Sequence, residues 1–280
     1  MRIACIATCA LIAFSAVETA TAQQPAQSHA AHAEELAKQL SNPIADLASM
    51  PLQFNWENGV GSDDDLRTVI NLQPVVPFKI SKDWNLIGRF IMPFVNQPAL
   101  APGGEASSGI GDIVLSGFLS PSVSKGATWG AGPVFGLPMS TDPVLGSGKW
   151  QAGPTAVVLK QAGPWTYGGL VNHLWSFADT GDAGREDVST TFLQPFLAYT
   201  TKSALTLTIQ SESTCNWEAR GGDAWTVPVN VIVSKVTRLG SFPFSVGGGG
   251  GYYVAHPDAG PDWKLRAVFT VILPNPKPVS

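Results

Sequence analysis

The chain has 280 residues, a formal net charge of −4 and only 14% charged residues. The negative charge argues against a nucleic-acid-binding protein, and the composition does not change between the two halves, so one domain is expected. The 29 glycines and nine tryptophans are typical of a closed β-barrel, in which aromatic rings lie at the lipid headgroups and glycine relieves crowding inside.

The N-terminal part predicts a signal followed by a short leader. Residues 1–22 predict a secretory signal peptide, because an apolar stretch ends at a small-x-small cleavage pattern, Ala20-Thr21-Ala22. Residues 23–49 predict a linker and a short helical segment, with the helix at 34–47 and broken by Pro43. Such a short helix is marginal in water on its own. It is therefore expected to plug the barrel lumen or to cap its mouth; the alternative is a frayed leader.

Residues 50–274 predict the barrel itself. Apolar and polar residues alternate there in short segments, most clearly at 205–212 and 225–234, which is the pattern of a strand with a different solvent on each face. We therefore expect an all-β protein, a closed antiparallel transmembrane β-barrel of about 12 strands with a short N-terminal helical segment. Residues 275–280 form a C-terminal tail.

The connections between the segments predict the orientation of this barrel. Short turns are expected at 81–83, 124–126, 161–164, 201–202 and 238–241, and longer loops at 57–65, 96–108, 139–148, 178–187, 216–224 and 255–261. Barrels of this type keep their turns in the periplasm and their loops outside. An even number of strands then places both termini on the periplasmic side. Basic residues gather beside the turns and acidic residues in the loops, which accords with two different surroundings.

A set of polar residues falls on the strand parity that is expected to face the lumen. A charge facing lipid at mid-membrane costs about 2–4 kcal/mol, so these side chains should point inward. The pore-lining candidates are Arg67, Asn71, Gln73, Asn85, Arg89, Asp112, Gln210, Glu212, Asn230, Lys264 and Arg266.

If the three arginines face Asp112 and Glu212, the lumen has a charged constriction that orients a polar or amphipathic solute. The competing hypothesis is that the charges lock a closed lumen for stability.

Motifs for catalysis and for cofactors are weak. His173 lies in a predicted strand with Ser176, Ser211 and Ser213 available, but acyl transfer needs a nucleophile, a base and an orienting group in mutual reach. No motif fixes that arrangement, so a girdle or lumen histidine is favoured. Gly247–Gly251 lacks the lysine of a phosphate loop and predicts a closely approached wall, where the N-terminal segment could rest. No metal or cofactor site is predicted.

Several segments resemble one bacterial family. They are residues 35–44, 71–78, 83–87, 109–113, 153–168 and 191–202, and the resemblance runs from Glu34 to Leu273. The family comprises outer-membrane "transporter" proteins grouped under the MetA pathway of phenol degradation and often mislabelled neuromedin U. The resemblance implies a barrel that passes small molecules, aromatic or hydrophobic ones among them, and it brings no catalytic residues. The chain departs from the family in its tail, since such barrels commonly end on an aromatic or apolar residue.

Three classes of function follow from these features. A passive channel for small molecules is the main hypothesis, a structural or adhesive outer-membrane barrel is the alternative, and a barrel lipid hydrolase is less favoured. The expected location is the cell outer membrane. The expected partners are outer-membrane lipid and lipopolysaccharide, the barrel assembly machinery and a small-molecule solute, with no nucleic acid.

Overall fold

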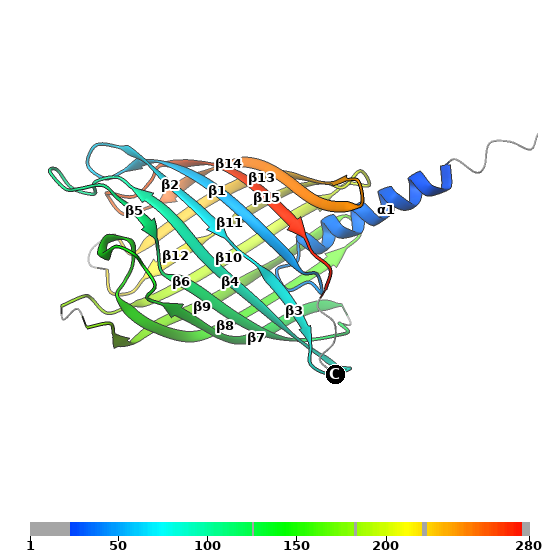
Figure 1. The fold of residues 1–280 in the computed structure, drawn as a ribbon, viewed down its shortest axis with the longest axis horizontal. Coiled ribbons are helices and arrows are strands. Elements are labelled where there is room, and N and C mark those ends of the chain that lie inside the picture. The colour runs from blue at the N-terminus through cyan, green and yellow to red at the C-terminus, as the bar shows by residue number, and fades with distance from the viewer. Residues whose placement is uncertain (1–22, 125, 182–183, 220–222, 276–280) are drawn as a thin grey trace, which may run out of the picture.

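Twelve antiparallel barrel strands form a closed β-barrel in the computed structural model (Figure 1), which describes residues 23–124, 126–181, 184–219 and 223–275. The predicted signal peptide lies outside the described residues. The strands are β1 Ser49–Val60, β2 Asp65–Leu72, β3 Val75–Lys79, β4 Trp84–Gln97, β5 Ser107–Ile110, β6 Ile113–Pro121, β7 Ala127–Leu137, β8 Lys149–Ala162, β9 Trp165–Asp179, β10 Ser189–Thr200, β11 Leu205–Ser211, β12 Ser213–Asn216, β13 Trp225–Leu239, β14 Phe242–Ala255 and β15 Trp263–Ile272. A short 3-10 turn, η1 Pro143–Leu145, lies in the loop before β8.

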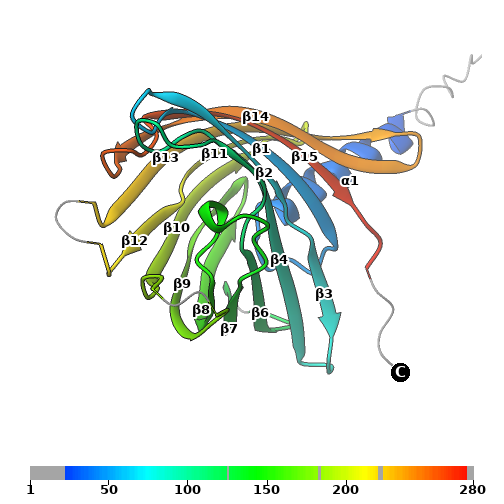
Figure 2. The same ribbon diagram turned by 60° about the vertical axis from the view of Figure 1, so that its left-hand side comes forward.

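Each barrel strand pairs with its neighbours along the chain, and the ring is closed by pairing of β15 with β1. Three barrel strands are interrupted once, so that β2 continues as β3, β5 as β6 and β11 as β12. A closed ring leaves no edge strand with unpaired backbone groups. The predicted closed barrel is confirmed, and Figure 2 shows the ring of strands from a second side.

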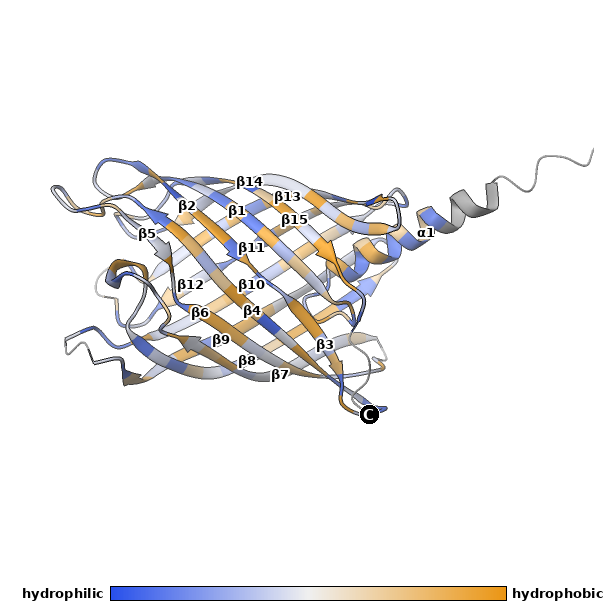
Figure 3. Cartoon of the chain, in the orientation of Figure 1, coloured by the Kyte–Doolittle hydropathy of each residue, from blue (hydrophilic) through white to orange (hydrophobic). Residues whose placement is uncertain are grey.

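Alternation of side chains along the strands gives the barrel two different surfaces. In β11, Leu205 and Leu207 are 39% and 44% exposed, whereas the intervening Thr206 is 3% exposed. Figure 3 shows hydrophobic and hydrophilic residues alternating along the strands in the same way. Successive residues of a strand point to opposite faces. The apolar parity therefore faces outward and the polar parity faces the lumen, as predicted.

Turns and loops gather at opposite ends of the barrel (Figure 1). The barrel begins and ends at the turn end, because Ser49 at the start of β1 pairs with Ile272 at the end of β15. The connection expected as a long loop at 57–65 is shorter than predicted. β1 continues to Val60 through an irregular register, and only residues 61–64 join it to β2. Gly61, with φ 79°, takes the left-handed conformation that this tight connection requires.

The N-terminal helix differs from its prediction at both ends. α1 spans Gln23–Leu40, so the expected linker at 23–33 is helical, which agrees with its alanine and glutamine content. The helix ends before Pro43, because a proline disfavours helical conformation in the preceding residue. α1 lies at the turn end (Figures 1 and 2), where Leu36 and Ala37 pack against Ala204, Val236 and Ile272. No helix in the described part of the chain is long and apolar enough to cross a membrane.

The glycine run in β14 is closely approached, as predicted, but by the neighbouring strand. A Cβ atom on Gly249 would overlap the carbonyl oxygen of Val231 in β13 and lie 2.8 Å from the Ile232 Cα. α1 packs mainly on β10, β11 and β13. The N-terminal segment therefore does not pack mainly on the glycine run of β14. Glycine is therefore required at this inward position by the close approach of β13.

Prolines within the strands coincide with interruptions of the pairing. Pro74 separates β2 from β3, and the pairing of β13 with β14 shifts between Val227 and Pro228. Pro133 and Pro154 face each other in the β7–β8 pairing, so two residues without a backbone N–H share one position of the ladder. Proline in a sheet belongs at such irregular positions because it cannot donate to the ladder.

Candidate functional site

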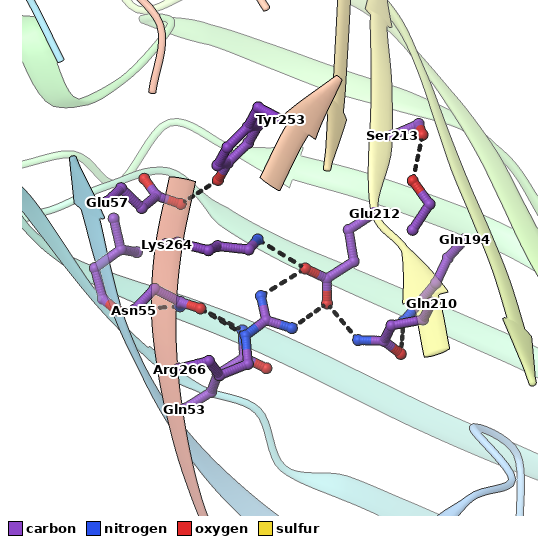
Figure 4. Close-up of polar contacts among 12 residues, drawn as sticks. Gln53, Asn55, Glu57, Gln194, Gln210, Glu212, Ser213, Tyr253, Lys264 and Arg266 are labelled. Carbon is purple, nitrogen blue, oxygen red and sulfur yellow. Dashed lines mark hydrogen bonds and ion pairs between the residues drawn. The ribbon is translucent and has the colours of Figure 1, made fainter. Parts of the chain in front are cut away.

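An ion pair on the luminal side of the barrel wall starts at a break between two strands. Glu212 lies between β11 and β12, and its carboxylate reaches Arg266 on β15 (Figure 4). Arg266 Nη1 donates to Oε1 at 2.9 Å and Nη2 to Oε2 at 2.6 Å. Lys264 Nζ lies 3.5 Å from Oε2. Paired, parallel hydrogen bonds of this kind are the strongest arrangement of arginine with carboxylate.

The sequence of β14 explains how Glu212 spans two intervening strands. On the luminal parity of β14, between Ser245 and Tyr253, every residue is a glycine. No side chain of β14 therefore stands at this level between the Glu212 carboxylate and β15. The same glycines that allow β13 to pack closely leave the space in which the ion pair forms.

Amide side chains extend the ion pair to neighbouring strands. Arg266 Nε donates to Asn55 Oδ1 of β1 at 2.7 Å, and Gln210 Nε2 donates to Glu212 Oε1 at 3.1 Å. Gln194 Nε2 of β10 in turn donates to Gln210 Oε1 at 3.3 Å. We call Gln194, Gln210, Glu212, Lys264, Arg266 and Asn55 the luminal network (Figure 4).

A second ion pair lies beside the first, nearer the loop end. Arg67 Nε donates to Glu57 Oε2 at 2.7 Å, and the Tyr253 hydroxyl donates to Glu57 Oε1, also at 2.7 Å. Lys264 Nζ lies 5.2 Å from the centroid of the Tyr253 ring, within the range of a cation–π interaction. The Tyr253 ring thus joins the two ion pairs.

Arg89 is the luminal cation without a carboxylate partner. Its Nη2 donates to Gln73 Oε1 at 3.1 Å, and among the described residues no carboxylate lies in ion-pair contact with it. Four luminal cations, Arg67, Arg89, Lys264 and Arg266, lie with two luminal carboxylates, Glu57 and Glu212, among the described residues. This part of the lumen therefore carries an excess of positive charge within the described part of the chain.

Asp112 does not belong to this constriction, which corrects the prediction that it faces the arginines. Its Oδ2 accepts hydrogen bonds from the backbone N–H and the hydroxyl of Ser147, both at 2.7 Å. Asp112 follows β5 at the break before β6, where a carboxylate can cap the donors of an overlying loop. It holds the loop that contains η1 and does not narrow the lumen.

The remaining candidates lie on the inner wall outside the ion pairs. Asn85 Oδ1 accepts from the Ser122 hydroxyl near the turn end, and Asn71 lies opposite Gln53 in the β1–β2 pairing. Asn230 is 1% exposed, and its amide has no hydrogen-bond partner among the described residues. These three residues line the lumen without contacting Glu212 or Arg266 through any described hydrogen bond.

The list of sequence candidates lacks four members of the site, Glu57, Asn55, Tyr253 and Gln194. Glu57 and Asn55 lie on the polar parity of β1, which the alternation of that strand already showed. Tyr253 lies on the luminal parity of the glycine-rich strand, where its aromatic side chain gives no polar signal. Sequence could have found the first two by the same rule that found Arg67, but not the third.

A cavity of about 250 Å³ lies between the luminal network and α1. Its polar side is formed by Gln53, Gln73, Arg89, Gln194, Gln210 and Glu212. Its apolar side includes Val75, Phe196, Ile232 and Val268 on the barrel wall and Leu40 and Leu47 on the N-terminal segment. Hydroxyl groups also line the cavity, among them those of Thr206, Ser234 and Thr270. The cavity therefore has a charged end and an end where apolar side chains are mixed with hydroxyl groups.

Residues 41–48, which we call the inner segment, fill the turn end of the lumen. Ile44 is 3% exposed and packs in a cluster with inward-facing residues that include Ile87, Phe118 and Phe196. The tail is tied to the same segment, because Asn275 Oδ1 accepts from the Ala48 N–H at 2.8 Å. The expectation that the N-terminal segment plugs the lumen or caps its mouth stays a prediction, with the inner segment inside the turn end and α1 packed beside it. It was not predictable that a patch of the inner wall would be apolar enough to receive it.

His173 lies on the outer face near the loops, so of the two predicted positions, girdle or lumen, the structure excludes the lumen. Its ring centroid lies 4.0 Å from that of Trp175, which is 51% exposed. Its Nδ1 lies 2.8 Å from Thr191 Oγ1 and its Nε2 lies 3.5 Å from Ser189 Oγ.

The three serines considered beside His173 are engaged elsewhere. Ser211 and Ser213 hydrogen-bond to each other at 2.7 Å, and Ser176 donates to Asp187 at 3.3 Å. The group that holds His173 Nδ1 is a neutral hydroxyl, whereas catalytic triads place a carboxylate or an amide there. Among the described residues, no group of three potential metal ligands occurs.

Closed strands, an apolar outer face and a charged lumen define an antiparallel barrel of the outer-membrane class. The chain is similar to an outer-membrane channel from Pseudomonas putida F1, with a TM-score of 0.62 and 18% identity over 81% of this chain and 96% of that one. It is also similar to the NanC porin, with a TM-score of 0.54 and 9% identity over 80% of this chain and 99% of that one. The outer membrane phospholipase A from Escherichia coli gives a TM-score of 0.46 at 13% identity, over 81% of this chain and 90% of that one.

At these identities the comparisons show the fold alone. No protein-family model matches the sequence, and no curated protein matches it. The resemblance to the phenol-degradation grouping stays a prediction.

Proposed function

We propose that the protein is a channel of the bacterial outer membrane for passive passage of small molecules, aromatic or hydrophobic ones among them. The observation that carries this proposal is the excess of positive charge among the described luminal residues of a closed barrel. Charged side chains that only had to stabilise a closed lumen would be expected to balance, because an unpaired buried charge is costly. Here Arg89 has no carboxylate partner among the described residues, which favours a lumen that admits water and solute.

The orientation belongs to the same proposal. The turns, α1 and both ends of the barrel lie together, and barrels of this class keep their turns in the periplasm. Both termini are then periplasmic, and the loops face outward toward lipopolysaccharide. The apolar outer face is the surface that would contact membrane lipid, and the barrel assembly machinery would insert it.

Single-channel recording of the refolded protein, residues 23–280, tests this function. We expect discrete conductance steps in planar bilayers, with the barrel running on gels at different positions before and after boiling, because a closed strand network resists detergent. A luminal variant, Lys264→Gln, should change the conductance or the ion selectivity. Val231→Ala, on the outer face where Val231 is 45% exposed, should change neither.

Absence of conductance in both the wild type and a variant that lacks residues 23–47 would favour the structural or adhesive barrel. The truncated variant is needed because the inner segment fills the turn end and could close the wild-type lumen. Recovery of the protein in the soluble periplasm, with no heat-dependent shift on gels, would contradict the membrane location.

A further inference from the structure

We propose that the luminal cavity binds small organic monocarboxylates with an apolar body, and that Arg89 holds the carboxylate. This inference rests on the proposed channel function, because it names the solute class of the same lumen. It starts from the one luminal arginine that the protein itself leaves without an ion-pair partner among the described residues.

Arg89 has donors to spare at the cavity surface. A guanidinium carries five N–H donors in a planar fork, and the described hydrogen bonds of Arg89 comprise a single bond to Gln73 Oε1 at 3.1 Å. Arg89 is half-buried and lines the cavity. A carboxylate matches the fork of an arginine with two parallel hydrogen bonds, so it is the ligand group that the free donors fit.

The neighbouring charges select an anion and exclude a cation. Glu212 is the carboxylate at this end of the cavity, and Arg266 and Lys264 already engage it. Two cations therefore engage Glu212 before a solute arrives, while Arg89 interacts with Glu212 at longer range and forms no ion pair with it among the described residues. A cationic solute would meet the excess of positive charge.

The other end of the cavity selects an apolar body. Val75, Phe196, Ile232 and Val268 line it, and Leu40 lies at its base on α1. Burial of apolar surface against this wall stabilises a bound solute by the hydrophobic effect. The cavity volume of about 250 Å³ lies below the roughly 300–1,000 Å³ of sites for drug-sized ligands, so the ligand must be small.

The two ends together fix the orientation of the ligand. Its carboxylate lies at Arg89, toward the luminal network, and its apolar part lies toward the inner segment. Acetate lacks the apolar part and 1-pentanol lacks the charge. Pentanoate carries both, which makes these three molecules a matched set of probes.

Calorimetric titration of the purified full barrel with pentanoate tests the site, after subtraction of titrations into detergent alone. We expect pentanoate to bind, and acetate and 1-pentanol to bind at least about tenfold more weakly. Arg89→Gln should weaken pentanoate binding at least about tenfold, because the charge-assisted bonds are lost. Arg89→Lys should retain part of the affinity, since the charge remains. Arg238→Gln, at the exposed end of β13, should leave the affinity unchanged.

The proposal is overturned if wild-type protein does not bind pentanoate, if 1-pentanol binds equally well, or if Arg89→Gln binds as the wild type does. The heat-dependent gel shift shows whether each variant is folded, and the comparison of the three probes on the wild type stands without any variant. If the barrel conducts ions but binds no pentanoate, the channel function stands and the proposed binding site is wrong. If the barrel binds pentanoate but conducts no ions, the binding site stands and the channel function is wrong.

Discussion

Arg266 and Glu212 form a bidentate ion pair across the lumen, with Nη1–Oε1 and Nη2–Oε2 distances of 2.9 Å and 2.6 Å. The pair joins β15 to the break between β11 and β12, past two intervening strands. Both partners have further contacts, Arg266 with Asn55 and Glu212 with Gln210. The ion pair therefore braces the wall and sets the charge of the narrow part of the lumen at the same time.

Glu212→Gln should lower stability and move ion selectivity toward anions. Arg266 and Lys264 are 5% and 4% exposed, and among the described residues Glu212 is the carboxylate that pairs with each of them. Leaving buried polar groups poorly satisfied costs about 1–3 kcal/mol, and the lumen gains net positive charge. Urea unfolding in micelles and reversal potentials measure the two effects.

The matched control for this change is Glu34→Gln on α1. It removes a carboxylate from an ion pair with Lys38 one helical turn away, which contributes only about 0.2–0.5 kcal/mol. If Glu212→Gln lowered stability as little as the control does and left the reversal potential unchanged, the luminal ion pair would neither stabilise the barrel nor determine its ion selectivity.

Gly249→Ala should impair folding, whereas Gly248→Ala should not. A Cβ on Gly249 would overlap the Val231 carbonyl and lie 2.8 Å from the Ile232 Cα, so β13 and β14 would have to separate. The nearest atom to a Cβ on Gly248 is the Arg266 carbonyl oxygen at 3.5 Å, which is ordinary contact. Overpacking costs about 1–3 kcal/mol. The folded fraction on unboiled gels and the urea midpoint measure the difference; equal behaviour of the two variants would contradict the close approach.

The barrel was predictable from sequence because its signal is local. Alternation in segments such as 205–212 reports directly which residues face which solvent, and it placed Arg67, Arg89, Glu212 and Arg266 on the inward parity. The partners of those residues were not predictable in the same way. Glu212 and Asp112 both fall on the strand parity expected to face the lumen. Asp112, however, lies at a break between two strands, beneath a loop that supplies Ser147 as its hydrogen-bond partner.

The inner apolar patch escaped prediction for a related reason. Ile87, Phe118 and Leu159 are apolar residues on the luminal parity, so alternation is lost where they occur and the segment reads as uniformly apolar. Their role depends on Ile44, which reaches them from a segment that is remote in sequence. Pairings that depend on such a distant contact leave no periodic signal in either segment.

Ile44→Ala should loosen the inner segment and open the turn end. The Ile44 side chain is buried against the apolar patch, and truncation of a buried isoleucine to alanine costs about 2–5 kcal/mol. We expect faster proteolysis between residues 41 and 48 and a larger conductance. Val123→Ala is the control, because Val123 is 78% exposed in the turn before β7. Unchanged proteolysis of the Ile44 variant would mean that other contacts hold the segment.

His173→Ala should leave ester turnover at background, because the wild type is expected to have none. Ser189 Oγ lies 3.5 Å from Nε2, but the hydroxyl of Thr191 that holds Nδ1 carries no charge to stabilise an imidazolium. Phospholipid and p-nitrophenyl ester hydrolysis in micelles measure this. A clear wild-type rate that both His173→Ala and Ser189→Ala abolish would establish a hydrolase.

Selectivity should respond to the luminal arginines more than to the acidic outer mouth. Lys149 pairs with Asp179 and with Asp187, so those two carboxylates of the mouth are already compensated. Asp63, Asp64 and Asp65 are exposed beside the shortest outer connection, and their field is screened beyond roughly 8 Å at physiological salt. Asp63–65→Asn should therefore chiefly change the conductance at low salt.

Replacement of Arg89 and Arg266 by Gln should instead move the reversal potential in a salt gradient toward cations at every salt concentration. We expect these two luminal arginines to lie close to a passing ion, too close for salt to screen their charge, and the narrowest part of a pore normally dominates its selectivity. The Arg89 change should cost little stability, because its described hydrogen-bond partner is the neutral Gln73. The Arg266 change should also weaken the bracing of the wall. No shift in the reversal potential after both replacements would mean that the permeant ions do not pass these side chains.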